Sequence, residues 1–148
     1  MISEESLKEL ISSNKLIIEG SNDPVKGCAV KLHLGSTCKQ IVSPIIDLNN
    51  LAAVEYKPID ISGGYNLHPN DFLLVYTFEK VTMPEGYMGW IETRGSLANI
   101  GLQVHFCDAH IDPGSSLNIA LQIKNNSNAV IKIRPEIYIA KMYIDELN

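Results

Sequence analysis

The chain has 148 residues, a formal net charge of −5, 45% hydrophobic residues and 20% charged residues. This length predicts one domain, over residues 1–148, that can bury a core without disulfides or metal. The lysines and arginines form no cluster, which argues against a nucleic-acid partner but is compatible with a local basic pocket for one phosphate group.

The first stretch, SEESLKELISSN, predicts a helix. Ser3 is a candidate N-cap, and the two glutamates after it favour the positive end of a helix. Leu7, Leu10 and Ile11 share one face at i, i+3 and i+4, and this pattern stops around Asn14. The following KLIIEG is predicted to be extended. The start is acidic and amphipathic, unlike a signal peptide.

After the helix the sequence predicts β-structure. CAVKLHLG alternates, with Ala29, Lys31 and His33 on one side of the predicted strand. Further strand candidates follow at short spacing: KQIVSPI, LAAVEYKPI, FLLVYTFEKV, GYMGWIETR, GLQVHF, LNIALQIKN, AVIKIRP and IYIAKMYI. Turn signals such as HPND, MPEG and DPGSS separate them. This series is typical of a mainly β sandwich or barrel with one N-terminal helix.

Several of these strands, such as FLLVYTF, IALQI and IYIAKMYI, are apolar on both sides. Together they carry more hydrophobic surface than one small core uses. Packing between subunits explains this surplus, and a large core is the alternative.

The three cysteines are an odd number without paired spacing, which predicts reduced thiols in the cytoplasm. Neither C-x-x-C nor the H-x-E and P-C-x-x-C pair of zinc deaminases is present, so no protein-bound metal is predicted. No apolar run approaches the ~20 residues that cross a bilayer, so we expect no membrane partner.

The segment RGSLANIGLQVHFCDAHIDPG, residues 94–114, is densest in residues that could do chemistry. With VKLHLG before it and IALQIKN and IRPEIYIAKM after it, the order of motifs resembles the dCTP deaminase branch of the dUTPase-like superfamily, from about residue 7 to residue 143. The N-terminal helix favours this branch over plain dUTPases. The resemblance implies a distorted β jelly roll or barrel that assembles as a homotrimer, with nucleotide sites at subunit interfaces.

Some residues match the family's motifs. In this resemblance, Arg94 corresponds to the arginine of the phosphate-binding motif and Ser96 to its second hydroxyl residue. His105 matches a family histidine, and Asp112 begins the Asp-Pro-Gly turn that meets the sugar and base. The parts that hold a nucleotide are therefore expected to remain.

Other positions depart from the motifs. Gly95 replaces a catalytically important hydroxyl residue, Asn99 a second arginine, and Lys31 an aspartate. Gln122 stands where the resemblance places the general acid/base glutamate. Deamination of cytosine needs a group that shuttles protons between water and the leaving amine, and an amide has no proton to exchange near neutral pH.

These positions predict a nucleotide-binding protein that has lost catalysis and binds or sequesters a nucleotide. By analogy, phage proteins that act as sponges for signalling nucleotides are one biological setting. Arg94 and Ser96 would hold a phosphate, and Lys31 would add positive charge. The other candidate ligand-binding residues are Gly95, Asn99, His105, Asp108, His110, Asp112 and Gln122.

The alternative is an enzyme of pyrimidine deoxynucleotide metabolism, a divergent dCTP deaminase or dUTP diphosphatase. In a dUTPase, Asp112 would orient the attacking water, and Mg²⁺ would be held mainly by the triphosphate rather than by the protein. Lys31 argues against this interpretation, as does the sequence after the last strand, YIDELN, which carries no Gly-rich or basic arm to close the site. A trimer that grips a protein through the same rim is a third hypothesis.

Structural interpretations of the same residues stay open. Arg94 could pair across a subunit interface, and His105 could be a satisfied core histidine. Lys31 could be solvated, and the Asp-Pro-Gly sequence is first of all a turn signal.

Overall fold

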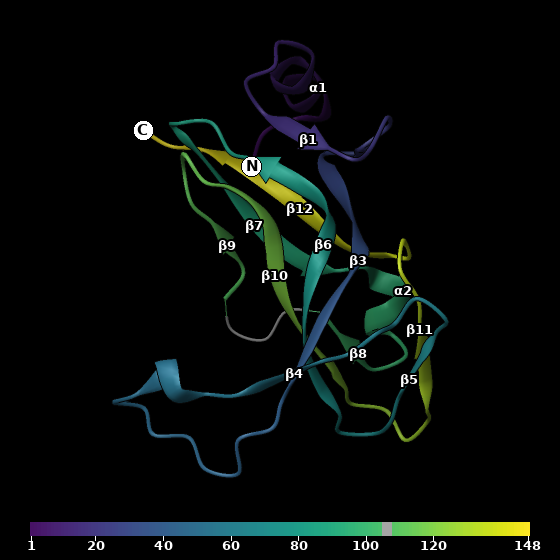
Figure 1. Cartoon of the computed structure of the whole chain (residues 1–148). Helices are drawn as coiled ribbons and strands as arrows, with labels where there is room; N and C mark the ends of the chain where they lie inside the picture. Colours follow the sequence, from purple (N-terminus) through teal and green to yellow (C-terminus); the bar gives the residue numbers. More distant parts are fainter. Residues whose placement is uncertain (105–107) are drawn as a thin grey trace.

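The N-terminal helix lies at one end of a curled β-sheet (Figure 1). The computed structural model describes residues 1–104 and 108–148. Helix α1 (Glu4–Ser12) begins after Ser3, whose side chain accepts a hydrogen bond from the backbone N–H of Ser6 at 3.1 Å. Leu7 and Leu10 are buried against the core. The predicted helix and its N-cap are confirmed.

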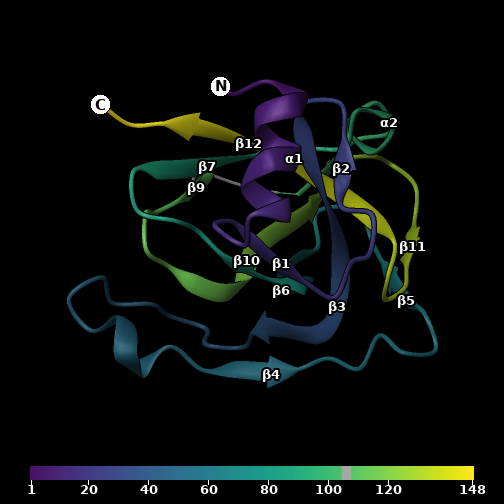
Figure 2. The same cartoon turned by 90° about the horizontal axis from the view of Figure 1, so that it is seen from above.

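Most strands belong to one antiparallel sheet, in the order β8-β10-β6-β3-β12-β7-β9. Strand β1 also pairs with β6, strands β2 and β4 pair with β3, and β11 forms a separate ladder with β5. The strands are β1 (Ile17–Glu19), β2 (Val25–Lys26), β3 (Ala29–Ile41), β4 (Tyr56–Pro58), β5 (Tyr65–Leu67), β6 (Phe72–Thr82), β7 (Tyr87–Thr93), β8 (Leu102–Gln103), β9 (His110–Ile111), β10 (Ser116–Asn125), β11 (Ile131–Ile133) and β12 (Tyr138–Glu146). The sheet curls into a half-barrel, so the predicted mainly β class is confirmed (Figures 1 and 2).

Strand β3 corrects one sequence prediction. CAVKLHLG and KQIVSPI, predicted as separate strands, belong largely to one strand of 13 residues. Its pairing with β6 shifts register between Leu34 and Cys38, which bends the strand without ending it. Gly35 lies in this bend, where a Cβ would approach the carbonyl oxygen of Tyr76 to 2.7 Å. The glycine therefore marks close backbone packing rather than a strand end.

Two short helical elements were not predicted. The first half of LAAVEYKPI forms a 3-10 turn, η1 (Leu51–Ala53), and RGSLA forms a single helical turn, α2 (Gly95–Ala98). In α2 the backbone N–H of Asn99 donates to the carbonyl of Gly95 at 3.0 Å. Sequences of three or four residues are too short to carry a helical period.

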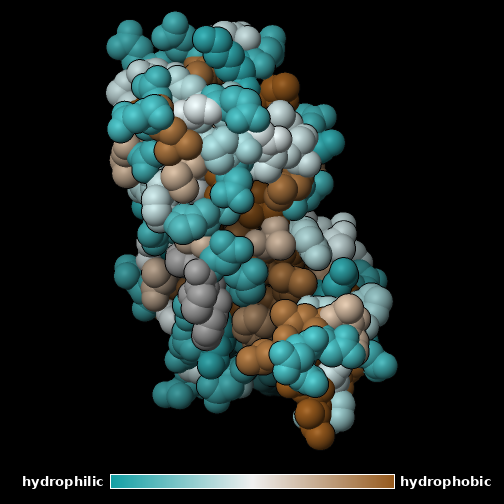
Figure 3. Space-filling view, turned by 90° about the vertical axis from the view of Figure 1, so that its left-hand side faces the viewer, coloured by the Kyte–Doolittle hydropathy of each residue, from teal (hydrophilic) through white to brown (hydrophobic). Residues whose placement is uncertain are grey.

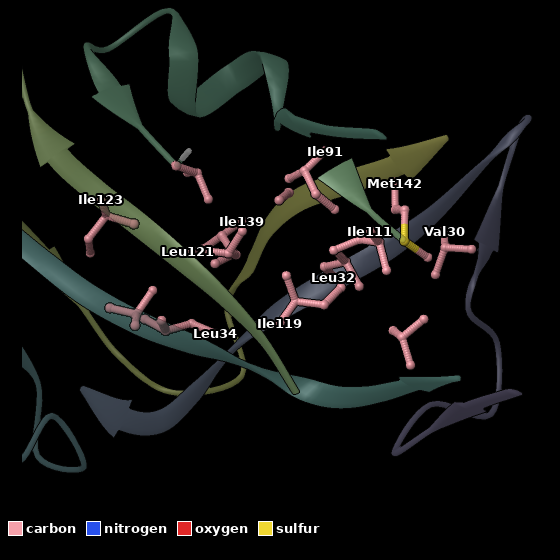
Figure 4. Packing of buried hydrophobic residues seen from close by; sticks show 14 of the residues in the cluster. Val30, Leu32, Leu34, Ile91, Ile111, Ile119, Leu121, Ile123, Ile139 and Met142 are labelled. Atoms are coloured by element: carbon pink, nitrogen blue, oxygen red, sulfur yellow. The ribbon is translucent and has the colours of Figure 1, made fainter. Parts of the chain in front are cut away.

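Alternate residues of the long strands form the core. Figure 4 shows how Leu32 and Leu34 of β3 pack toward Leu121 and Ile123 of β10, with Met142 of β12 nearby. All five side chains are almost inaccessible to solvent. No helix among the described residues has the length and apolar composition of a membrane span.

The segment between β3 and β4, residues 42–55, extends away from the half-barrel (Figures 1 and 2). We call it the β3–β4 arm. Ile45, Leu48 and Leu51 in this arm are 85%, 82% and 61% exposed. Hydrophobic side chains gather over it in the lower part of Figure 3. These exposed apolar residues lie outside the strands β6, β10 and β12, whose two-sided hydrophobicity the sequence indicated.

Candidate functional site

A cavity of about 480 Å³ lies between the β2–β3 turn, the start of α2 and the outer face of β12. Three of its lining residues, Lys26, Arg94 and Lys141, are cationic and none is acidic. The full lining is Lys26, Gly27, Cys28, Ala29, Arg94, Gly95, Ser96, Tyr138, Lys141 and Tyr143. In a chain of net charge −5 this local excess of positive charge favours an anionic ligand.

Arg94 is fixed by contacts with β12. It follows the last residue of β7, and its backbone N–H donates to the carbonyl of Ile139 at 2.9 Å. The guanidinium donates to the carbonyl of Tyr138 at 3.3 Å, and its carbon lies 4.7 Å from the centre of the Tyr138 ring. A guanidinium has five N–H donors, so most of them remain for a ligand.

The residues after Arg94 leave the cavity wall open. Gly95 and Ser96 are exposed, and nothing lies within 4 Å of the position that a Cβ of Gly95 would occupy. A hydroxyl side chain would therefore fit at this position, and packing does not explain the glycine. Asn99 follows α2 as its C-cap and is exposed, outside the cavity lining.

Lys31 lies on β3 beside the cavity. It is directly opposite Lys141 of β12, which is in turn opposite Glu92 of β7. The Lys31 ammonium is 4.0 Å from the carboxylate of Asp23. Like charges placed opposite each other on paired strands are unfavourable, so the lysine pair costs stability. A hydrogen bond with Tyr143 is the main cause of the raised pKa of Lys141, which therefore stays charged at neutral pH.

His110 and Asp112 lie at the edge strand β9 and the turn that follows it. His110 is exposed, pairs in register with Trp90 of β7, and its ring meets the indole edge-to-face at 4.3 Å between centroids. Asp112 is exposed, and its backbone carbonyl accepts from the Ser115 hydroxyl at 2.6 Å. Asp108 is exposed as well, and His105 lies outside the described residues.

Gln122 lies on β10, opposite Leu74 of β6. It is half-buried, and its buried Oε1 has no hydrogen-bond partner among the residues that the structure describes. Strands β6, β3 and β12 separate β10 from β7 in the sheet. Of the predicted ligand-binding residues that the structure describes, the chain thus brings Arg94, Gly95 and Ser96 into one cavity and leaves the others outside its lining.

Sequence reasoning missed the two lysines and two tyrosines of this cavity, Lys26, Lys141, Tyr138 and Tyr143, and the β2–β3 turn beside them. The alternation within IYIAKMYI carries a signal for two of them, because Lys141 and Tyr143 lie two residues apart on the outer face of β12. No group of three or more His, Cys, Asp or Glu side chains suited to a metal ion occurs within residues 1–104 and 108–148.

Comparison with known proteins gives the family. Residues 1–147 match the family model described as dCTP deaminase-like. The chain belongs to this family. The dCTP deaminases of Shewanella sp. (strain ANA-3) and Psychromonas ingrahamii are each 31% identical to it over 157 residues, which is 96% of this chain and 81% of theirs. The resemblance predicted from the motifs is confirmed.

Solved structures support the same fold. The 2'-deoxycytidine 5'-triphosphate deaminase of Agrobacterium tumefaciens superposes with a TM-score of 0.76 at 16% identity, covering 97% of this chain and 47% of that chain. A dUTPase from phage phi11 of S. aureus superposes with a TM-score of 0.58 at 14% identity, covering 90% of each chain. The dUTPase-like fold is thereby established.

Proposed function

We propose that this member of the dCTP deaminase-like family binds a nucleotide without deaminating it. The observation that carries the proposal is the chemistry of Gln122, which stands where the resemblance places a proton-shuttling glutamate. Its half-buried amide has an unpartnered Oε1 among the described residues and can accept a hydrogen bond. It cannot exchange a proton near neutral pH, and losing general acid–base catalysis costs roughly 10²–10⁴ in rate.

The neighbouring replacements support the same conclusion. Gly95 brings no hydroxyl to the cavity although there is space for one, and exposed Asn99 brings no charge. Arg94 and Ser96 meanwhile remain at the cavity wall. The site has lost groups that would promote reaction and has kept groups that bind phosphate.

We further propose a homotrimer in which the site is completed between copies of the chain. Two observations support this. His110, Asp112 and Gln122 are outside the cavity that holds Arg94, so one copy does not assemble the predicted set. The β3–β4 arm also exposes large apolar side chains, which is typical of an interaction surface.

In this proposal the base or ribose is read by His105, Asp108, His110 and Gln122, and the bound nucleotide is sequestered in the cytoplasm rather than converted. Lys31 adds positive charge near the cavity. Mg²⁺ enters only as the counter-ion of a bound triphosphate, because the phosphates themselves supply its main ligands.

The alternative function is that of a divergent dCTP deaminase or dUTP diphosphatase. The exposed carboxylate of Asp112, at a turn where a water could reach it, favours the diphosphatase over the deaminase.

One experiment separates binding from catalysis. The protein is incubated with dCTP, dUTP, cyclic nucleotides and ADP-ribose-type nucleotides, then heated, and the released compounds are separated by chromatography. We expect one of them to be released unchanged and only after heating, and Arg94→Ala to lose it. Deoxyuridine products or pyrophosphate would overturn the proposal. So would the absence of any thermal shift, because a ligand at 100 times its Kd adds about 2.7 kcal/mol of stability.

A further inference from the structure

Three aromatic side chains form a row across neighbouring strands beside the cavity. Tyr143 of β12 lies directly opposite Trp90 of β7, and Trp90 lies directly opposite His110 of the edge strand β9 (Figure 1). Residues directly opposite each other on antiparallel strands share one face of the sheet. We propose that these three residues, the aromatic row, are a stacking surface for the base of the bound nucleotide and favour a purine. This inference rests on the proposed nucleotide binding and names the class of base.

The aromatic row lies on the outer face of the sheet. Trp90 is 39% exposed, although the residues before and after it, Gly89 and Ile91, are buried. His110 is exposed as well. The indole therefore points away from the core and does not serve to fill it. Two adjoining exposed rings offer a larger flat contact area than a single surface ring, which is typical of a binding surface.

The rings at the end of the row form a corner. The centroids of Trp90 and His110 are 4.3 Å apart, and the planes of the two rings meet at 87°. A planar group can therefore stack on one ring while its edge meets the other. The indole N–H also interacts with the carboxylate of Asp145, which restricts the orientation of the ring. Rings that are ordered before a ligand arrives lower the entropy cost of binding it.

Tyr143 connects the aromatic row with the cavity, because its side chain belongs to both. The Lys141 ammonium lies 5.6 Å from the centre of the Tyr143 ring, and Arg94 lines the same cavity. A nucleotide whose phosphate contacts Arg94 thus has aromatic side chains next to it. Positive charge for phosphates beside aromatic rings for bases is the combination by which proteins hold single-stranded nucleic acids. The same chemistry suits a single nucleotide here.

The length of the row indicates the class of base. Neighbouring strands lie about 4.8 Å apart, so a row over three strands extends over about 10 Å. The gain from stacking grows with the apolar area that is covered. A purine has two fused rings and covers more of this row than a pyrimidine does. We therefore expect purine nucleotides to bind more tightly than pyrimidine nucleotides with the same number of phosphates.

Trp90 is the single tryptophan of the chain, so its fluorescence reports stacking directly. The wild type is titrated with dATP, dGTP and ADP-ribose as purine ligands, with dCTP and dUTP as pyrimidine ligands, and with adenosine and tripolyphosphate. Calorimetry compares the affinities of the wild type, Trp90→Leu and His110→Ala. The matched control is His68→Ala, which removes an exposed imidazole between β5 and β6.

We expect the purine nucleotide that binds to quench Trp90 and to bind both variants about tenfold more weakly, an effect typical of removing one stacking aromatic. Tripolyphosphate has no ring, so its binding should be the same in all variants. His68→Ala should bind the nucleotide as tightly as the wild type. Because His110 is exposed, His110→Ala is expected to keep the melting temperature of the wild type.

The outcomes distinguish the aromatic row from the proposed function. If nucleotides bind through Arg94 but neither Trp90 fluorescence nor the affinities of the two variants change, the row is wrong and nucleotide binding stands. If no nucleotide binds while adenosine still quenches Trp90 in a manner that requires His110, the row stands and the proposed function fails. Equal quenching by dCTP and dATP overturns the preference for a purine. Fluorescence that changes with chain concentration and not with added ligand means that another copy of the chain covers the row, which also overturns the inference.

Discussion

Glu79 of β6 carries a carboxylate and is 0% exposed. One of its oxygens accepts a hydrogen bond from the backbone N–H of His33 at 2.9 Å, and the other pairs with Nδ1 of the same residue. Glu79→Ala therefore removes both interactions at once and leaves the two His33 groups without their partner.

The expected loss follows from these contacts. A buried hydrogen-bond donor that loses its acceptor costs roughly 1–3 kcal/mol, and Glu79→Ala leaves two His33 groups in this state. The His33 side chain is 26% exposed, so water replaces part of what it loses. We expect Glu79→Ala to lower the free energy of unfolding by about 3 kcal/mol, because two His33 groups lose their partner and water reaches one of them in part. Glu79→Gln keeps an oxygen for the His33 N–H, and we expect it to cost about 1–2 kcal/mol.

Urea unfolding at a fixed chain concentration, followed by the fluorescence of the single tryptophan Trp90, measures these values. The reasoning is refuted if Glu79→Ala lies within about 0.5 kcal/mol of the wild type, which is the usual effect of a surface substitution. It also fails if the glutamine variant is as unstable as the alanine variant. The His33 ring lies 5.7 Å from the ring of Tyr138, which contacts Arg94, so both variants should also weaken the nucleotide binding proposed above.

Gly35→Ala should lower stability by roughly 1–3 kcal/mol, because its Cβ would meet a backbone carbonyl of β6 at 2.7 Å. Gly63→Ala, where nothing lies within 4 Å, is the control, and equal melting temperatures of the two variants would contradict the packing argument. Burial raises the pKa of the Cys38 thiol to about 11, so at pH 8 it should react with a thiol reagent only after unfolding. Rapid labelling of Cys38 in the folded protein would disprove this. Gln122→Glu should still yield no deoxyuridine nucleotide from dCTP by chromatography, since in the proposed function Gly95 and Asn99 also replace residues of the family's motif. Appearance of that product would mean that the glutamine alone blocks deamination.

The long elements could be predicted because their residues repeat with a clear period. The apolar spacing of Leu7 and Leu10 indicates α1, and alternation indicates β6, β10 and β12. Strands β2, β5 and β9 have two or three residues each, and a period cannot be recognised over that length. Only pairing with β3, β11 and β7 defines them as strands.

Only those cavity residues that lie within one short sequence motif could be predicted. Arg94 and Ser96 could be predicted because their order within one segment matches the motif. Lys26 and Lys141 could not, because they are far apart in the sequence and meet only through the pairing of β2 with β3 and of β3 with β12. Contacts between residues so far apart in the sequence depend on the strand order of the sheet, and the residue pattern of a single sequence does not specify that order.

The place of β12 in the sheet also affects how the protein is made. It lies between β3 and β7 and joins them, although it is formed by residues 138–146. During synthesis β3 and β7 leave the ribosome long before this strand and must wait for it with their facing edges unpaired. Exposed strand edges invite pairing with other chains, so these two edges are open to misassembly until residues 138–146 have been made. The walls of the cavity are formed by β12 and by segments next to the two strands that pair with it, so the cavity forms only once β12 has joined them.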